Sequence, residues 1–193
     1  GIRVVLVMNR KGGSGKSTLC RALASAAAAK GETVTIFDTD ASKSCLKWMQ
    51  AGKEAGNWSP LVEVVHTLDA QRVAAAMLSR GDLSVILETA NWYLKRRRRV
   101  EKPGELAGFS VLLNRVPVRV SETERAVAEE LFQSLPALET YLGSRAAYVR
   151  MDREGLLGVI ADKTPNRALA THVQSAMKEA GDLLEEIDQL ILN

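Results

Sequence analysis

A glycine-rich segment at residues 11–18, Lys-Gly-Gly-Ser-Gly-Lys-Ser-Thr, restricts the fold of this 193-residue chain more than any other feature. Residues 4–8 before it form a short β-branched run, which is typical of a strand buried on both faces. Residues 17–30 after it are rich in alanine and leucine and end at Gly31, which predicts a helix with its stop residue. Phosphates are held by inward-turned backbone N–H groups, which glycines permit and a helix N-terminus supplements. The segment therefore predicts a phosphate-binding loop.

The polar side chains of this loop have separate expected roles. Lys16 is placed to reach the β- and γ-phosphates of ATP, and the Ser17 hydroxyl is placed to ligate Mg²⁺. The predicted ATP-binding residues of the loop are Lys11, Gly12, Gly13, Ser14, Gly15, Lys16, Ser17 and Thr18.

A second strand follows the loop helix and ends on two carboxylates. Residues 33–37 are β-branched and lead into Asp38-Thr39-Asp40, so the order strand–loop–helix–strand predicts the βαβ unit of a parallel sheet. The carboxyl ends of parallel strands line the ligand crevice, and residues two apart on a strand face the same way. Asp38 and Asp40 would there hold Mg²⁺ through water and orient an attacking water. The alternative is that they cap the helix expected at residues 42–50.

The rest of the chain continues the alternation of strands and helices. We expect strands at residues 61–66, 109–113 and 148–150, and helices at residues 69–79, 121–134 and 166–192. The last helix is amphipathic and is expected to pack on the sheet. The predicted fold is a single α/β domain over residues 1–193, with a mostly parallel central sheet and helices on both faces.

The loop sequence, with its additional lysine at Lys11, resembles the deviant Walker A motif of the ParA/MinD family of P-loop ATPases. The resemblance implies an ATP-sandwich homodimer in which Lys11 crosses to the partner's nucleotide. A cation there would stabilise charge on the γ-phosphate in the transition state. The competing interpretation makes Lys11 a solvated loop lysine.

Two further segments carry the resemblance. ParA-type proteins have a similar Asp-x-Asp segment, although this chain has Ala41-Ser42 where they usually have Pro-Gln. By resemblance, Asp40 is the hydrolysis-linked residue, beside Lys11 and Lys16, and Asp38 lies on the magnesium side with Ser17. Residues 111–118 resemble the family strand that borders the adenine, which places Asn114 at the base. The pattern is most similar to small ParA proteins and to VirC-type ATPases of conjugative DNA transfer.

The chain departs from the family between residues 83 and 99, where about forty residues of a Walker B strand, a loop and a further strand would normally fit. Residues 85–89 would form the Walker B strand if Glu88 replaced the usual aspartate. Alternatively, Asp82 caps a helix whose apolar residues have helical spacing, namely Leu83, Ile86, Leu87, Ala90 and Leu94. We favour the helix, which leaves a strand–loop–strand segment missing near Gly81 and predicts that the natural chain contains more residues there. If the segment is truly absent, nucleotide binding is expected without turnover.

Charge and composition admit a nucleic-acid partner. The net charge is +3, and residues 95–99 are five consecutive cations, which form either a solvated helix end or a non-specific DNA contact. Lys163, Arg167 and Lys178 are weaker candidates for DNA contact. Cys20 and Cys45 are expected as free thiols, and they have no metal-ligand spacing with His66 or His172.

These features predict a ParA-like ATPase switch that dimerises on ATP·Mg²⁺, binds DNA non-specifically and positions plasmid, DNA-transfer or protein cargo. An adaptor, centromere-binding or relaxosome-type protein is the expected partner, and the expected location is the cytoplasm, on the nucleoid. One alternative is a nucleotide-binding adaptor without turnover. The other is a MinD-like membrane-positioning ATPase, which the acidic tail at residues 181–188 disfavours. No membrane contact is therefore expected, and no apolar stretch approaches the roughly 20 residues of a membrane span.

Overall fold

The structure is a computed structural model, and it describes residues 4–7, 15–68, 84–88, 114–116, 122, 140, 142–143 and 145–192. The helix expected at residues 69–79 and the strand expected at 109–113 lie outside the described residues. So do the basic run at 95–99 and, apart from Glu122, the helix expected at 121–134.

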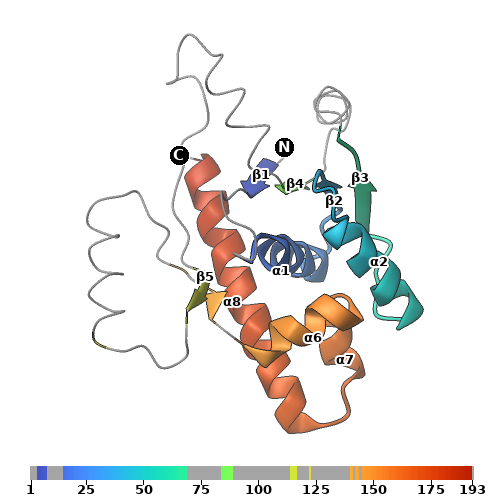
Figure 1. The fold of residues 1–193 in the computed structure, drawn as a ribbon. Helices are drawn as coiled ribbons and strands as arrows, with labels where there is room; N and C mark the ends of the chain where they lie inside the picture. Colours follow the sequence, from blue (N-terminus) through green and yellow to red (C-terminus); the bar gives the residue numbers. More distant parts are fainter. Residues whose placement is uncertain are drawn as a thin grey trace.

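The main sheet of the fold has four strands and is parallel throughout (Figure 1). Its strands lie in the order β1 (Val4–Val7), β4 (Ser84–Glu88), β2 (Val34–Asp38) and β3 (Val62–His66). In the register, Glu88 lies between Val7 and Asp38, and Asp38 pairs with His66. The carboxyl ends of all four strands therefore form one row. The expected βαβ unit, the parallel sheet and the strand at residues 61–66 are confirmed.

The helix that we favoured across residues 83–94 is wrong, because β4 lies in its place between β1 and β2. A short apolar run fits helical spacing and a buried strand equally well, so periodicity alone does not decide between them. The position between two parallel strands decides it, because a strand there satisfies backbone N–H and C=O groups on both of its neighbours. With the central strand present, the reason for inferring a missing segment near Gly81 is removed.

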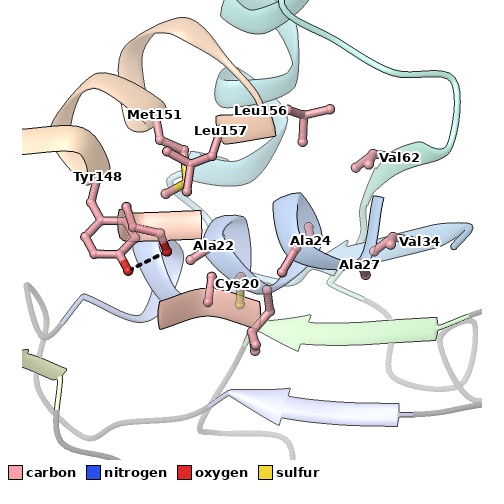
Figure 2. Close-up of a cluster of buried hydrophobic side chains, with 14 of the residues drawn as sticks. Cys20, Ala22, Ala24, Ala27, Val34, Val62, Tyr148, Met151, Leu156 and Leu157 are labelled. Atoms are coloured by element: carbon pink, nitrogen blue, oxygen red, sulfur yellow. Dashed lines mark hydrogen bonds between the residues drawn. The ribbon is translucent and has the colours of Figure 1, made fainter. Parts of the chain in front are cut away.

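Helix α1 (Lys16–Ala29) contacts β1, β2 and β4, and α2 (Ser44–Glu54) contacts β2 and β3. Residues 20–27 of α1 are all buried, because a second layer of helices covers the side of α1 away from the sheet (Figure 1). Small side chains allow this close approach from both sides. Figure 2 shows Ala22, Ala24 and Ala27 along α1, with Met151 and Leu157 of the layer formed by these helices on one side and Val34 of the sheet on another. The helix predicted at residues 17–30 is confirmed.

The covering layer consists of α6 (Ala146–Glu154), α7 (Leu157–Lys163) and α8 (Arg167–Leu192). The long amphipathic helix is confirmed as α8, but it packs mainly against α1 and α7 rather than on the four-stranded sheet. Within the described part of the chain, no helix combines the length and hydropathy of a membrane span. The prediction of helices on the opposite face of the sheet concerns segments outside the described residues.

The strand predicted at residues 148–150 is also wrong, because these residues belong to α6. Ala147, Tyr148 and Met151 share one buried face of that helix, and the Tyr148 hydroxyl lies 2.8 Å from Glu179 Oε2 on α8. Tertiary contact of this kind overrides the β propensity of a short Tyr-Val pair. The strand that precedes α6 is β6 (Leu142–Gly143), which pairs in parallel with β5 (Asn114–Val116).

Candidate nucleotide-binding site

The junction between the glycine-rich loop and α1 is described from Gly15 onward. Gly15 is buried and precedes the helix at φ 83° and ψ 18°, in the left-handed region that favours glycine. Lys16 and Ser17 are the first residues of α1, and both are half-buried. The first N–H groups of a helix have no partner within the helix, and they carry the positive end of its dipole. An anion is therefore favoured at this junction.

The other residues that are predicted to bind the nucleotide are described less completely. Lys11, Gly12, Gly13 and Ser14 lie outside the described residues, so their contacts stay predictions. Asn114 is the first residue of β5, and its predicted contact with adenine also stays a prediction.

Asp38 ends β2 and is fully buried, at 0% exposure. Its Oδ2 accepts the backbone N–H groups of Cys45 at 2.9 Å and Leu46 at 3.2 Å, both in the first turn of α2. Its Oδ1 accepts the N–H of Asp40 at 3.1 Å. The capping interpretation therefore describes Asp38, and its place on the magnesium side stays a prediction.

Asp40 lies in the turn between β2 and α2 and is half-buried. Its Oδ1 accepts the N–H of Ser42 at 3.0 Å, and its backbone oxygen lies 3.0 Å from Nε2 of His66. Lys43, at φ 55°, closes this turn just before α2. The two aspartates thus differ: Asp38 holds the helix start, whereas Asp40 shapes a solvent-accessible turn beside the end of β3.

We expect Asp38→Ala to lower the free energy of unfolding by about 3 kcal/mol, because it removes a helix cap and leaves buried N–H groups without an acceptor. Asp40→Ala is the matched control and should cost less than about 1 kcal/mol, because it removes one hydrogen bond in an accessible turn. Urea unfolding of both variants measures the difference. Equal losses would contradict the capping role of Asp38.

Five residues form a chain of contacts between α1, α2 and α6. Its two ends, Ser17 and Thr18, are adjacent in sequence, so the chain closes, and we call it the three-helix ring. Its members are Ser17, Ser44, Arg21, Asp152 and Thr18. Ser17 Oγ lies 2.8 Å from Ser44 Oγ, and Arg21 Nη2 donates to the backbone oxygen of Ser44 at 2.8 Å. Arg21 Nη1 lies 2.8 Å from Asp152 Oδ1, and the Thr18 hydroxyl donates to Asp152 Oδ2 at 3.0 Å. The ring begins and ends on adjacent residues of the predicted loop.

Arg21 holds this ring in a protein interior, at 8% exposure. Burial disfavours its charged form, but the hydrogen bond to Asp152 and the negative charge of that carboxylate prevail and raise the pKa of Arg21. Its guanidinium also lies 5.8 Å from the Trp48 ring centroid. Sequence reasoning missed this residue, although a lone arginine four residues after Ser17 on an alanine-rich helix is a usable signal. No signal in the sequence points to Asp152.

The oxygen groups at this end of the sheet fit Mg²⁺. Ser17 and Asp38 both contact the first turn of α2, through Ser44 and Cys45, and Glu88 ends the strand beside Asp38. Hydroxyl and carboxylate oxygens are ligands that Mg²⁺ prefers. The described residues contain no group of three or more metal-ligating side chains. Such a group is not needed, because Mg²⁺ at nucleotide sites keeps several waters and binds phosphates with one or two protein oxygens.

Parallel strands ending in one row beside a loop–helix junction define a P-loop fold of the α/β class. A sequence profile of the CobQ/CobB/MinD/ParA nucleotide-binding domain matches residues 5–189, and the chain belongs to this family. The resemblance to ParA/MinD proteins is thereby confirmed.

The individual relatives have low sequence identity to this chain. The chain is 30% identical to the maintenance of carboxysome distribution protein A of Gloeobacter kilaueensis over 190 residues, covering 80% of this chain and 82% of that protein. It is 23% identical to protein virC1 of Rhizobium radiobacter, covering 76% and 79% of the two chains. A probable plasmid-partitioning protein ParA of Thermus thermophilus is 27% identical over 96% of this chain but only 53% of its own length.

A solved structure has the same fold. The putative plasmid partition protein of Borrelia burgdorferi B31 bound to AMPPNP matches with a TM-score of 0.59, covering 100% of this chain and 99% of that one. At 14% identity, this match supports the α/β fold alone.

Proposed function

We propose that this chain is a ParA-type switch that binds ATP·Mg²⁺, dimerises around the nucleotide and returns to the monomer after hydrolysis. The observation that carries the proposal is that Gly15 precedes α1 in a left-handed conformation, and that Ser17 contacts the first turn of α2, which Asp38 caps from the carboxyl end of β2. That arrangement brings backbone donors for phosphate and carboxylates for Mg²⁺ and water to one edge of the sheet.

Each predicted residue has one part in this switch. Lys16 binds the β- and γ-phosphates, Ser17 ligates Mg²⁺, and Lys11 reaches the nucleotide of the partner subunit. Asp40, in its accessible turn, orients the attacking water.

The names of the relatives support a proposal for the cargo and the partners. Three kinds of relative align with most of this chain: a protein named for plasmid partitioning, a protein named for carboxysome distribution, and virC1. We propose that the dimer holds DNA through non-specific phosphate contacts, with residues 95–99 contributing, and moves plasmid, transferred DNA or a protein assembly on the nucleoid. An adaptor protein bound to the cargo would stimulate hydrolysis.

The dimer is tested by gel filtration with light scattering in ATP, in ADP and without nucleotide. We expect wild type to double its mass in ATP·Mg²⁺ only, Lys11→Ala to remain a monomer and Asp40→Ala to stay dimeric for longer. A wild-type protein that is monomeric under all three conditions would remove the proposed switch.

A nucleotide-binding adaptor without turnover is the second candidate. It is favoured by Glu88, which ends the strand between β1 and β2 at a position where the family usually has an aspartate. Because a glutamate carboxylate extends one methylene farther from the backbone than an aspartate carboxylate, it does not simply replace aspartate as a Mg²⁺ ligand. Phosphate release measured with DNA present separates the two candidates, since an adaptor would bind ATP and release none.

A further inference from the structure

The three-helix ring connects the predicted Mg²⁺ ligand to α2 and α6. Ser17 contacts Ser44 through their hydroxyl oxygens at 2.8 Å. A serine hydroxyl has one proton to donate and two lone pairs to offer. When Ser17 offers a lone pair to a cation, its proton must point to another acceptor. Ser44 Oγ lies where that acceptor is needed.

Hydrogen bonds hold the backbone at Ser44 in place. Ser44 is the first residue of α2, its carbonyl oxygen accepts a hydrogen bond from Arg21, and the next N–H in the chain donates to Asp38. Arg21 is in turn held by Asp152, which also accepts the hydroxyl of Thr18. The backbone from which the Ser44 hydroxyl extends is therefore held by two buried anchors, Asp38 on β2 and Arg21 on α1.

We propose that Ser44 is a positioning residue for the Mg²⁺ of the bound nucleotide, with Arg21 holding it in place. The Ser44 oxygen accepts the proton of Ser17 and thereby directs a Ser17 lone pair toward the cation. Partners behind a metal ligand commonly orient it in this way, and their loss costs about 10- to 100-fold in metal affinity or activity. This inference rests on the proposed binding of nucleotide at the loop.

The test compares the affinity for ADP in Mg²⁺ with the affinity in EDTA, by calorimetry on the full chain. We expect Mg²⁺ to strengthen binding in wild type and this strengthening to fall about tenfold in Ser44→Ala. Binding in EDTA should be unchanged, because the loop amides and Lys16 hold the phosphates without Ser44. Ser44→Thr keeps the hydroxyl and should restore the Mg²⁺ effect.

Ser42→Ala is the matched control, because Ser42 is an exposed serine two residues away and outside the ring. It should behave as wild type. Arg21→Lys keeps the charge but loses the planar fork that serves both Ser44 and Asp152, so it should lower the Mg²⁺ effect as well. This variant serves as a second test if Ser44→Ala fails to fold.

Three results would overturn the inference. One is a Mg²⁺ effect of wild-type size in Ser44→Ala, and another is the same loss in Ser44→Thr as in Ser44→Ala, which would indicate packing rather than the hydroxyl. The third is wild-type binding that is insensitive to Mg²⁺, which leaves nucleotide binding intact. A wild type that binds no nucleotide would remove the proposed function and the inference together.

Discussion

Lys16→Ala is expected to weaken ATP binding by at least about 100-fold, which corresponds to about 3 kcal/mol. Lys16 is the first residue of α1, next to the left-handed Gly15. Its side chain therefore extends from the helix N-terminus, where an anion such as phosphate is favoured. Hydrogen bonds to charged groups contribute about 1.5–3 kcal/mol each, and Lys16 is placed to make them to two phosphates. Calorimetric titration with a non-hydrolysable ATP analogue measures the loss.

Lys30→Ala is the control for Lys16→Ala, because Lys30 caps the other end of the same helix and pairs with the exposed Glu185 at 3.1 Å. It should bind nucleotide as wild type does. Both variants should keep the wild-type unfolding temperature, since neither lysine is buried. Undiminished binding by Lys16→Ala would place the nucleotide elsewhere.

Gly155→Ala is expected to destabilise the fold by about 4 kcal/mol or more, because two costs add. Gly155 ends α6 at φ 119° and ψ −145°, a conformation that is essentially restricted to glycine. A Cβ atom there would overlap the backbone oxygen of Asn57 and lie 3.0 Å from the Cα of Gly52 in α2. Backbone atoms cannot rotate away as a side chain would.

The same overlap would disturb two hydrogen bonds that join the layer of α6, α7 and α8 to α2 and to the segment that follows α2. Leu156 N–H donates to Asn57 O at 3.0 Å, and Trp48 Nε1 lies 3.2 Å from Gly155 O. Gly181→Ala is the control, since nothing lies within 4 Å of its added Cβ inside α8. There alanine should stabilise the helix by about 0.5–1 kcal/mol. Thermal and urea unfolding measure both, and similar effects at the two positions would contradict the clash.

Local sequence signals correctly predicted β1, α1, β2 and β3. The loop at residues 11–18, the alanine-rich helix after it and the β-branched run before Asp38 each specify one element, and their order specifies a parallel sheet. These signals are local, because glycine, capping and periodicity act within a few residues of one another. The family match over residues 5–189 confirms the class that they indicate.

Two errors share one cause. Residues 84–88 and 148–150 are short segments in which local preference was weak, and each adopted the structure that its neighbours required. The first fills the space between β1 and β2, and the second presents Tyr148 and Met151 to the core. Propensity alone cannot decide such segments, because the pairing and burial that decide them come from distant residues.

The sequence by itself determined the family, and it predicts which side chains meet phosphate and Mg²⁺, since the loop and the Asp38-Thr39-Asp40 segment are each contiguous. Only the tertiary structure decided what holds them. It showed that Asp38 caps α2, that Glu88 ends the strand beside it, and that Ser17 and Thr18 are connected through Ser44, Arg21 and Asp152. Thr18 and Asp152 are 134 positions apart. Their contact depends on how α6 packs over α1, which no local pattern encodes.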